Sequence, residues 1–192
     1  MPKISSPTLA EHQARQRRAL VAAAVAILAD GGVGALTPAS AGRRASLARS
    51  STYQYFDSGA ALVAAAVEAA QAEVDGAVIR ATGDAESSDG VIAAYISTLL
   101  ALATTVPARA VRALGHAELP PMCAARLREL ADAQREPLVA ALVTRGVPDP
   151  AGVAALVAAA VDAGAARVAA GEPVDAVRAQ VLGLVFGGVD GH

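Results

Sequence analysis

The chain has 192 residues, of which 54% are hydrophobic and 18% charged, a formal net charge of −2 and a single cysteine. This composition excludes an intrinsically disordered chain, which needs low hydrophobicity and high net charge, and one cysteine excludes an intrachain disulfide. The length suits one or two compact domains with a sizeable core. Alanine, the best helix former, dominates the apolar residues with valine, and few segments alternate as half-buried strands do. We therefore expect an all-α fold.

Charge is divided unevenly along the chain. Residues 1–57 hold seven Lys and Arg against three acidic residues, a net +4, whereas residues 58–192 hold nine Arg against fifteen acidic residues, a net −6. A basic N-terminal part and an acidic remainder are typical of a nucleic-acid-binding head on a body that avoids phosphate. Chance clustering of charge is the alternative interpretation.

The first ten residues are polar and contain proline, so we expect residues 1–10 to form a disordered tail. The N-terminal stretch has no apolar core and is no secretory signal, which together with the lone cysteine favours a cytoplasmic protein. A first helix is expected from residue 11 to about Asp30, with Leu20 and Leu28 on its inner face. The glycine pair at 31–32 is expected to end it.

Two short helices are expected in the stretch 36–62. Thr37 fits a helix N-cap, and Pro38 fits the first helical position. Residues 46–48 are expected to form a turn with Leu47 buried, and a second helix is expected over residues 49–55. Two short helices joined by three or four residues form a helix-turn-helix, whose second helix enters the major groove of DNA. The DNA-binding head is therefore expected over residues 11–58.

The side chains of this stretch suit contact with DNA. Arginine can bridge two acceptors on a guanine edge, serine can donate to bases or phosphates, and a helix N-terminus favours a phosphate. Taken alone, the aromatic cluster at 53–56 also fits a small helical core, and the adjacent arginines also fit a solvated face. The candidate DNA contacts that the residues suggest are Arg43, Arg44, Arg49, Ser50, Ser51, Tyr53 and Gln54.

The pattern T-P-A-S-x-x-x-R-A-x-L-A-R-S-S-x-Y-x-Y-F-x-S, which begins at Thr37, resembles the DNA-binding signature of the TetR family of transcriptional repressors. The match covers residues 18–62, and the rest of the chain is similar to the family only in length and helical character. The resemblance implies an all-helical homodimer, in which three N-terminal helices bind an operator and the remaining helices bind a small molecule and dimerise. By position it implies DNA contacts at Thr37, Arg49, Ser51, Tyr53 and Gln54, and a core role for Phe56.

Three positions depart from the family's pattern. Ser46 stands where glycine is usual, and serine adopts a positive φ less readily than glycine does. Ala48 stands at the N-cap of the second short helix, where serine is common. Gly59 stands where a basic residue often contacts phosphate, so we expect weaker anchoring to the DNA backbone there.

Six further helices are expected in residues 59–192, the predicted effector-binding and dimerisation domain. The loop 82–90 is the expected boundary between the helix that follows the head and the rest of the body. Pro137 is expected to kink or split the helix that contains it. The expected helical ranges are 59–81, 91–104, 107–116, 120–145, 150–170 and 173–187.

The last two of these helices are expected to dimerise. The helix over 150–170 is apolar on more than one face, and the last helix offers bulk at Leu182 and Phe186 and close approach at Gly183 and Gly187. Apolar coverage beyond one stripe predicts a second buried face. Two helices from each subunit would form a four-helix bundle, and a two-fold protein reads a pseudo-palindromic operator. An internal core helix is the alternative.

No catalytic constellation is evident in the sequence. The three histidines have no metal-ligand partner at useful spacing, and no activated nucleophile is recognisable. We therefore expect no enzyme, no metal and no cofactor. A small, largely apolar effector is expected in the body, and the scarcity of aromatic rings there disfavours a stacked planar cation. The candidate polar contacts, each of which also fits a structural role, are Tyr95, Arg112, His116, Met122 and Cys123.

These patterns together predict a dimeric, DNA-binding transcriptional regulator that acts as a repressor and leaves its operator when a small molecule binds. One alternative is an all-helical ligand-binding protein or enzyme without DNA function, which would bind no duplex at low salt. Another is a regulator that responds to a protein partner, which would have no enclosed cavity in its body.

Overall fold

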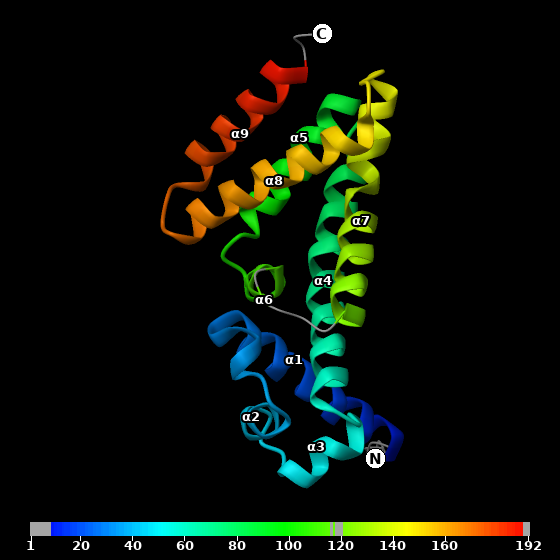
Figure 1. Ribbon diagram of the computed structural model, residues 1–192, viewed down its shortest axis with the longest axis vertical. Coiled ribbons are helices and arrows are strands. Elements are labelled where there is room, and N and C mark those ends of the chain that lie inside the picture. The colour runs from blue at the N-terminus through cyan, green and yellow to red at the C-terminus, as the bar shows by residue number, and fades with distance from the viewer. Residues whose placement is uncertain (1–8, 116, 118–120, 190–192) are drawn as a thin grey trace, which may run out of the picture. The chain divides into compact units, whose positions relative to one another are not determined.

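Helices make up nearly all of the described chain in a computed structural model (Figure 1). The structure describes residues 9–115, 117 and 121–189, without the side chains at positions 9, 49, 50, 121, 122, 188 and 189. Within these ranges no strand occurs, so the all-α prediction is confirmed. The helices are α1 (Leu9–Ala35), α2 (Pro38–Arg44), α3 (Arg49–Tyr55), α4 (Gly59–Gly83), α5 (Ser88–Ala101), α6 (Val106–Gly115), α7 (Pro121–Thr144), α8 (Pro150–Ala169) and α9 (Val174–Val189).

The chain divides into two compact units. The first comprises residues 1–70 and 109–118, and the second comprises residues 71–108 and 119–192. Helix α4 passes from one unit into the other, so the division lies within a helix. The loop expected over residues 82–90 is shorter in the structure, because α4 extends to Gly83 and the Ser87 hydroxyl already caps α5.

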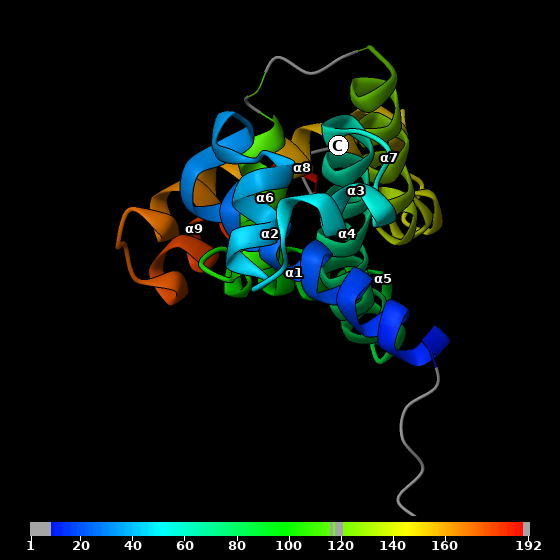
Figure 2. The same cartoon turned by 90° about the horizontal axis from the view of Figure 1, so that it is seen from below.

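Helix α1 forms the core of the first unit, and it packs against α2 (Figure 2). Its predicted inward residues Leu20 and Leu28 are fully buried. The predicted end near Asp30 is wrong by several residues, because helical turns resume after the glycine pair and continue to Ala35. The interruption itself is real: Gly32 adopts φ 69 and ψ −172, values outside the helical region. Glycine tolerates this conformation because it has no Cβ.

Helices α5, α7, α8 and α9 share the core of the second unit. Helix α8 approaches its neighbours closely at Gly164, where a Cβ would lie 3.0 Å from Leu100 Cδ2 and 3.1 Å from Val177 Cγ1. Helix α7 runs through Pro137 as one element, so the expected split of this helix does not occur. The fully buried aliphatic side chains of this core include Ile92, Ile96, Leu100, Leu138, Leu142 and Val177.

Two of the described helices are long and apolar enough to cross a membrane, judged by length and composition only. They are Ala10–Ala35 and Pro150–Ala169, and the bent pair of α5 and α6 would make a third span if counted as one. In each of the two helices only 33% of the apolar window is buried within the structure. Helix α8 therefore presents more apolar surface than the fold of one chain covers.

Candidate nucleic-acid interface

Helix α2 begins with the cap that the sequence predicts. The Thr37 hydroxyl accepts the backbone N–H of Ser40 at 3.0 Å, and the Thr37 backbone N–H donates to Ser40 Oγ at 2.9 Å. This reciprocal pair is a capping box, and Pro38 follows it at the first helical position. The Thr37 side chain therefore has a structural role at the start of α2, whether or not it also contacts DNA.

The turn between α2 and α3 depends on a serine in a left-handed conformation. Ser46 has φ 59, at the position where the sequence departs from the glycine of the TetR pattern. A residue with a Cβ is strained in this region. The Leu47 backbone N–H then donates to the Gly42 carbonyl oxygen at 2.8 Å and closes the turn. Leu47 itself is half-buried, so the expectation of a fully buried residue at this position is wrong.

Gly42 and Thr52 form the contact between α2 and α3. A Cβ at position 42 would lie 2.7 Å from Thr52 Oγ1 and 3.1 Å from the Leu47 carbonyl oxygen. Thr52 is fully buried, and its hydroxyl has no hydrogen-bond partner among the described residues. Neither residue is identified from the sequence, because glycine is usually unfavourable inside a helix and threonine is usually exposed to solvent. The only available signal was the position of Gly42 beside the inward Ala41.

Helix α3 divides into an inner and an outer face. It begins at Arg49 and ends at Tyr55, as predicted, and Ala48 provides no side-chain cap. Thr52 and Phe56 lie inward, so the core role of Phe56 is confirmed, whereas Tyr53 is 46% exposed. Gln54 is also exposed and Ser51 is half-buried. The predicted contacts through the Arg49 and Ser50 side chains lie outside the described residues.

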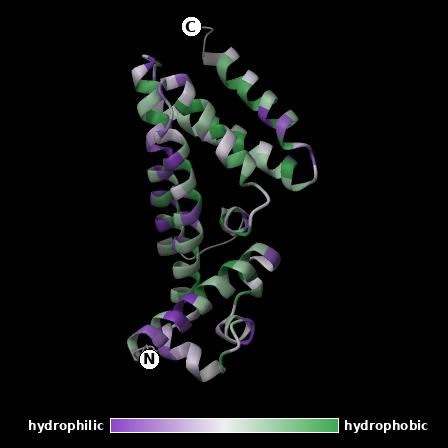
Figure 3. Ribbon diagram, turned by 180° about the vertical axis from the view of Figure 1, so that it is seen from behind, coloured by the Kyte–Doolittle hydropathy of each residue, from purple (hydrophilic) through white to green (hydrophobic). Residues whose placement is uncertain are grey.

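Helix α1 holds the C-terminal end of α3 in place. The Tyr55 hydroxyl donates to Gln16 Oε1. The Arg17 guanidinium carbon lies 5.2 Å from the centre of the Phe56 ring, within the range of a cation–π contact. Both contacts come from the first half of α1, where hydrophilic residues are concentrated (Figure 3). The outward direction of Tyr53 and Gln54 follows from this anchoring of their neighbours.

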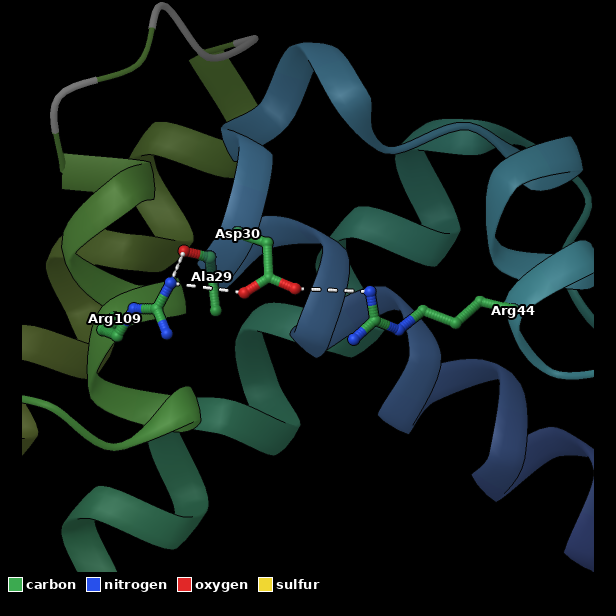
Figure 4. A network of polar contacts seen from close by, with 4 residues as sticks. All are labelled: Ala29, Asp30, Arg44 and Arg109. Atoms are coloured by element: carbon green, nitrogen blue, oxygen red, sulfur yellow. Dashed lines mark hydrogen bonds and ion pairs between the residues drawn. The ribbon is translucent and has the colours of Figure 1, made fainter.

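The two arginines of α2 are both exposed, as predicted, but they differ in their partners. Arg43 makes no ion pair among the described residues. Arg44 Nη1 lies 3.3 Å from Asp30 Oδ2 on α1. The other carboxylate oxygen of Asp30 faces Arg109 of α6, whose Nη2 lies 3.2 Å away (Figure 4). Arg44 is therefore already engaged inside the first unit.

Of the five predicted effector contacts, the structure describes the side chains of Tyr95, Arg112 and Cys123. Tyr95 is almost fully buried in the core of the second unit, and this burial raises the pKa of its hydroxyl to about 12. Cys123 is half-buried in the same unit, whereas the half-buried Arg112 belongs to the first unit. His116 and the side chain of Met122 lie outside the described residues. Within the described chain, no group of three or more His, Cys, Asp or Glu residues could hold a metal ion.

An open apolar pocket of about 660 Å³ lies elsewhere in the second unit, between the end of α7, α8 and α9. None of Tyr95, Arg112 and Cys123, the predicted residues whose side chains the structure describes, lines it. Its charged lining residue is Arg145, which pairs with Asp89 and lies 5.9 Å from the centre of the Phe186 ring. Two of its apolar lining residues, Leu156 and Leu184, are 72% and 67% exposed. The pocket is therefore part of an exposed apolar surface on α8 and α9.

Solved structures with low sequence identity share this fold over nearly the whole chain. A TetR-like transcriptional regulator from Rhodococcus sp. RHA1 is 20% identical, with a TM-score of 0.79 over 97% of this chain and 100% of its own. The transcriptional regulator FadR from Bacillus subtilis, solved in complex with stearoyl-CoA, is 14% identical, with a TM-score of 0.75 over 91% of this chain and 98% of its own. The chain has the TetR fold.

The TetR fold does not by itself assign a function. The superantigen PfiT also matches, with 15% identity and a TM-score of 0.72 over 87% of this chain and 94% of its own. No family model and no curated protein matches the sequence. The functional assignment must therefore come from the surface of the first unit and the chemistry of its exposed residues.

Replacing Gly42 by alanine is expected to destabilise the first unit by about 1–3 kcal/mol, because the new methyl group would overlap Thr52 Oγ1 and a backbone oxygen that cannot move cheaply. Thermal unfolding followed by circular dichroism measures this. Gly34→Ala is the matched control, since a Cβ there meets nothing within 4 Å. Equal effects of the two substitutions would contradict the close approach of α2 and α3.

Replacing Ser46 by glycine is expected to stabilise the protein by about 0.5–1 kcal/mol, because glycine adopts the observed φ of 59 without a Cβ clash. Ser46→Ala keeps the Cβ and should give no gain, so the pair separates backbone strain from loss of the hydroxyl. Denaturant unfolding of the two variants is the measurement. A loss of stability in Ser46→Gly would show that the turn is not strained.

Proposed function

We propose that the chain is a cytoplasmic, dimeric transcriptional regulator of the TetR type and not an enzyme, and that α3 inserts into the major groove of operator DNA. The observation that carries the proposal is the division of α3: Thr52 and Phe56 anchor it, while Tyr53 and Gln54 face solvent. A helix that packs against its own domain on one face and exposes polar side chains on the other can insert into the major groove of DNA. The net +4 charge of residues 1–57 supports the same role.

The proposal assigns different tasks to the exposed residues of the head. Gln54 and Arg49 are the base readers, because glutamine pairs with an adenine edge and arginine with a guanine edge. Thr37, Ser50, Ser51 and Tyr53 contribute contacts to phosphates or to further base edges. Arg43 and Arg44 contact phosphate, which positions the protein without reading sequence. Gly59 offers no side chain for an additional phosphate contact.

Arg49→Ala and Gln54→Ala are each expected to weaken binding by about 1–3 kcal/mol and to relax base preference at one position per half-site. The measurement is a selection of duplexes from a random pool by the full chain, followed by titration of the selected duplex. The exposed Ala60→Ser serves as a control outside α3. If the wild-type chain enriches no sequence, the DNA-binding function is refuted.

Arg43→Ala should instead weaken binding to all duplexes alike and reduce the slope of log affinity against log salt by about one, because one phosphate contact is lost. Fluorescence anisotropy at several salt concentrations measures this slope. The exposed Arg80→Ala removes the same charge from α4 and should leave the slope unchanged. A slope that Arg43→Ala does not alter would remove Arg43 from the interface.

The proposed dimer forms through α8 and α9. Leu156 on α8 and Leu184 on α9 are both largely exposed and line the same open apolar pocket, and contiguous exposed apolar surface marks an interaction site. Gly183 and Gly187 are exposed on α9 and allow close approach of another helix. A second copy related by a two-fold axis would cover this surface with the same surface of its own, as isologous dimers do.

Leu156→Glu and Leu184→Glu are each expected to convert the dimer to a monomer with unchanged helical content, because burying an unpaired carboxylate is strongly unfavourable. Sedimentation equilibrium gives the mass. Val143→Glu and Ile79→Glu are matched controls, since both residues are exposed apolar side chains on α7 and α4. A wild-type monomer, or dissociation by the controls alone, would contradict the assigned interface.

The effector is proposed to be a small, largely apolar molecule that binds the second unit and releases the operator. The mostly aliphatic interior of that unit supports this class, as does the stearoyl-CoA found in the FadR neighbour. Tyr95 is the proposed polar contact of the second unit, because its hydroxyl can donate a hydrogen bond. Repression then ends when ligand binding favours a conformation that does not match the operator.

A further inference from the structure

A carboxylate in the first unit is shared between two arginines from different helices (Figure 4). Asp30 Oδ2 lies 3.3 Å from Arg44 Nη1, and Asp30 Oδ1 lies 3.2 Å from Arg109 Nη2. The same Arg109 nitrogen donates to the Ala29 carbonyl oxygen at 2.9 Å. The side chains of Arg44, Asp30 and Arg109 are 49%, 51% and 40% exposed, so each can exchange a partner for water or an anion.

The three side chains come from elements with different roles. Asp30 lies on α1, and Arg44 is the last residue of α2 in the helix-turn-helix. Arg109 lies on α6, and the segment 109–118 is the only part of the chain after Ala70 that belongs to the first unit. Residues 106–108 at the start of α6 belong to the second unit. Arg109 is therefore the first residue of α6 that belongs to the first unit.

We propose that Asp30 is a positioning residue that competes with DNA phosphate for Arg44, and that Arg109 sets the strength of this competition. The inference rests on the proposed DNA-binding function. A guanidinium that is held by a carboxylate must leave it, at least in part, to contact a phosphate. Arg43, the neighbour of Arg44, has no such competitor among the described residues, so the two adjacent arginines are regulated differently.

The direction of the effect follows from charge. While Arg109 pairs with Asp30, it neutralises part of the carboxylate charge and occupies one of the two oxygens, so Arg44 is held weakly. When α6 moves and Arg109 leaves, both oxygens and the full charge face Arg44, which can then form the stronger bidentate pair. Arg44 becomes less available to phosphate, and DNA affinity falls. A displacement of α6 would thus weaken operator binding without any change in α3.

The test measures the affinity and salt slope of the full chain on the duplex that the wild type selects from a random pool. Asp30→Asn keeps the side-chain shape but removes the charge, so it should bind DNA about two- to fivefold more tightly, with a slope steeper by up to about one. Arg109→Gln should bind about two- to fivefold more weakly. The double variant should behave like Asp30→Asn, because Arg109 acts only through Asp30.

Combining Asp30→Asn with a second substitution at Arg44 or Arg43 separates competition for Arg44 from a general effect of charge on DNA binding. The gain from Asp30→Asn should vanish in an Arg44→Ala background and persist in an Arg43→Ala background. A gain that persists without Arg44 would overturn the proposal, since the removed charge would then act on DNA directly. Asp57→Asn, which removes a negative charge from an exposed position in the same unit, should give a gain that does not depend on Arg44.

The outcomes also separate this inference from the function on which it rests. If Asp30→Asn and Arg109→Gln both weaken binding, the network is merely structural and the inference fails while DNA binding stands. If the wild-type chain selects no duplex at low salt, the DNA-binding function fails and the role of Asp30 falls with it. Opposite signs for the two single variants, with the double variant equal to Asp30→Asn, would establish the proposal.

Discussion

The close approach of α2 and α3 at Gly42 and Thr52 is the contact on which the proposed DNA-binding head depends. The two short helices meet so closely that a methyl carbon added at position 42 would lie only 2.7 Å from Thr52 Oγ1. A seven-residue helix such as α3 is unstable in isolation, so its position comes from this contact and from Phe56 and Tyr55 at its other end. The packing of the inner face of α3 therefore determines which of its side chains face solvent.

The local structure of the head could be predicted because its signals are local. Thr37 and Pro38 mark the start of α2 through hydrogen bonding and a preset φ, and the departure from glycine at Ser46 is visible as a left-handed serine. The contact between Gly42 and Thr52 could not be predicted, because it depends on how two helices cross. The end of α1 was also misplaced, since Gly32 interrupts the helix at one residue without preventing the following turns.

The body was predicted less completely than the head, for a physical reason. Alanine occupies both buried and exposed positions on α8, so the sequence indicates excess apolar surface but not which residues pack within the chain. The structure separates them: Val157 and Val161 are buried, whereas Leu156 is exposed beside the open pocket. The expected effector residues were chosen for their chemistry alone, because the sequence does not show which side chains face a cavity.

A DNA protection experiment tests the central claim most directly. Methylation of guanine N7 occurs in the major groove, so a dimer that places one α3 in each of two half-sites should protect guanines in two clusters about one helical turn apart, roughly 10 base pairs. The duplex selected by the wild-type chain is the substrate. Two such clusters on the same face of the duplex would support the account, and a complex that leaves every guanine N7 reactive would contradict it.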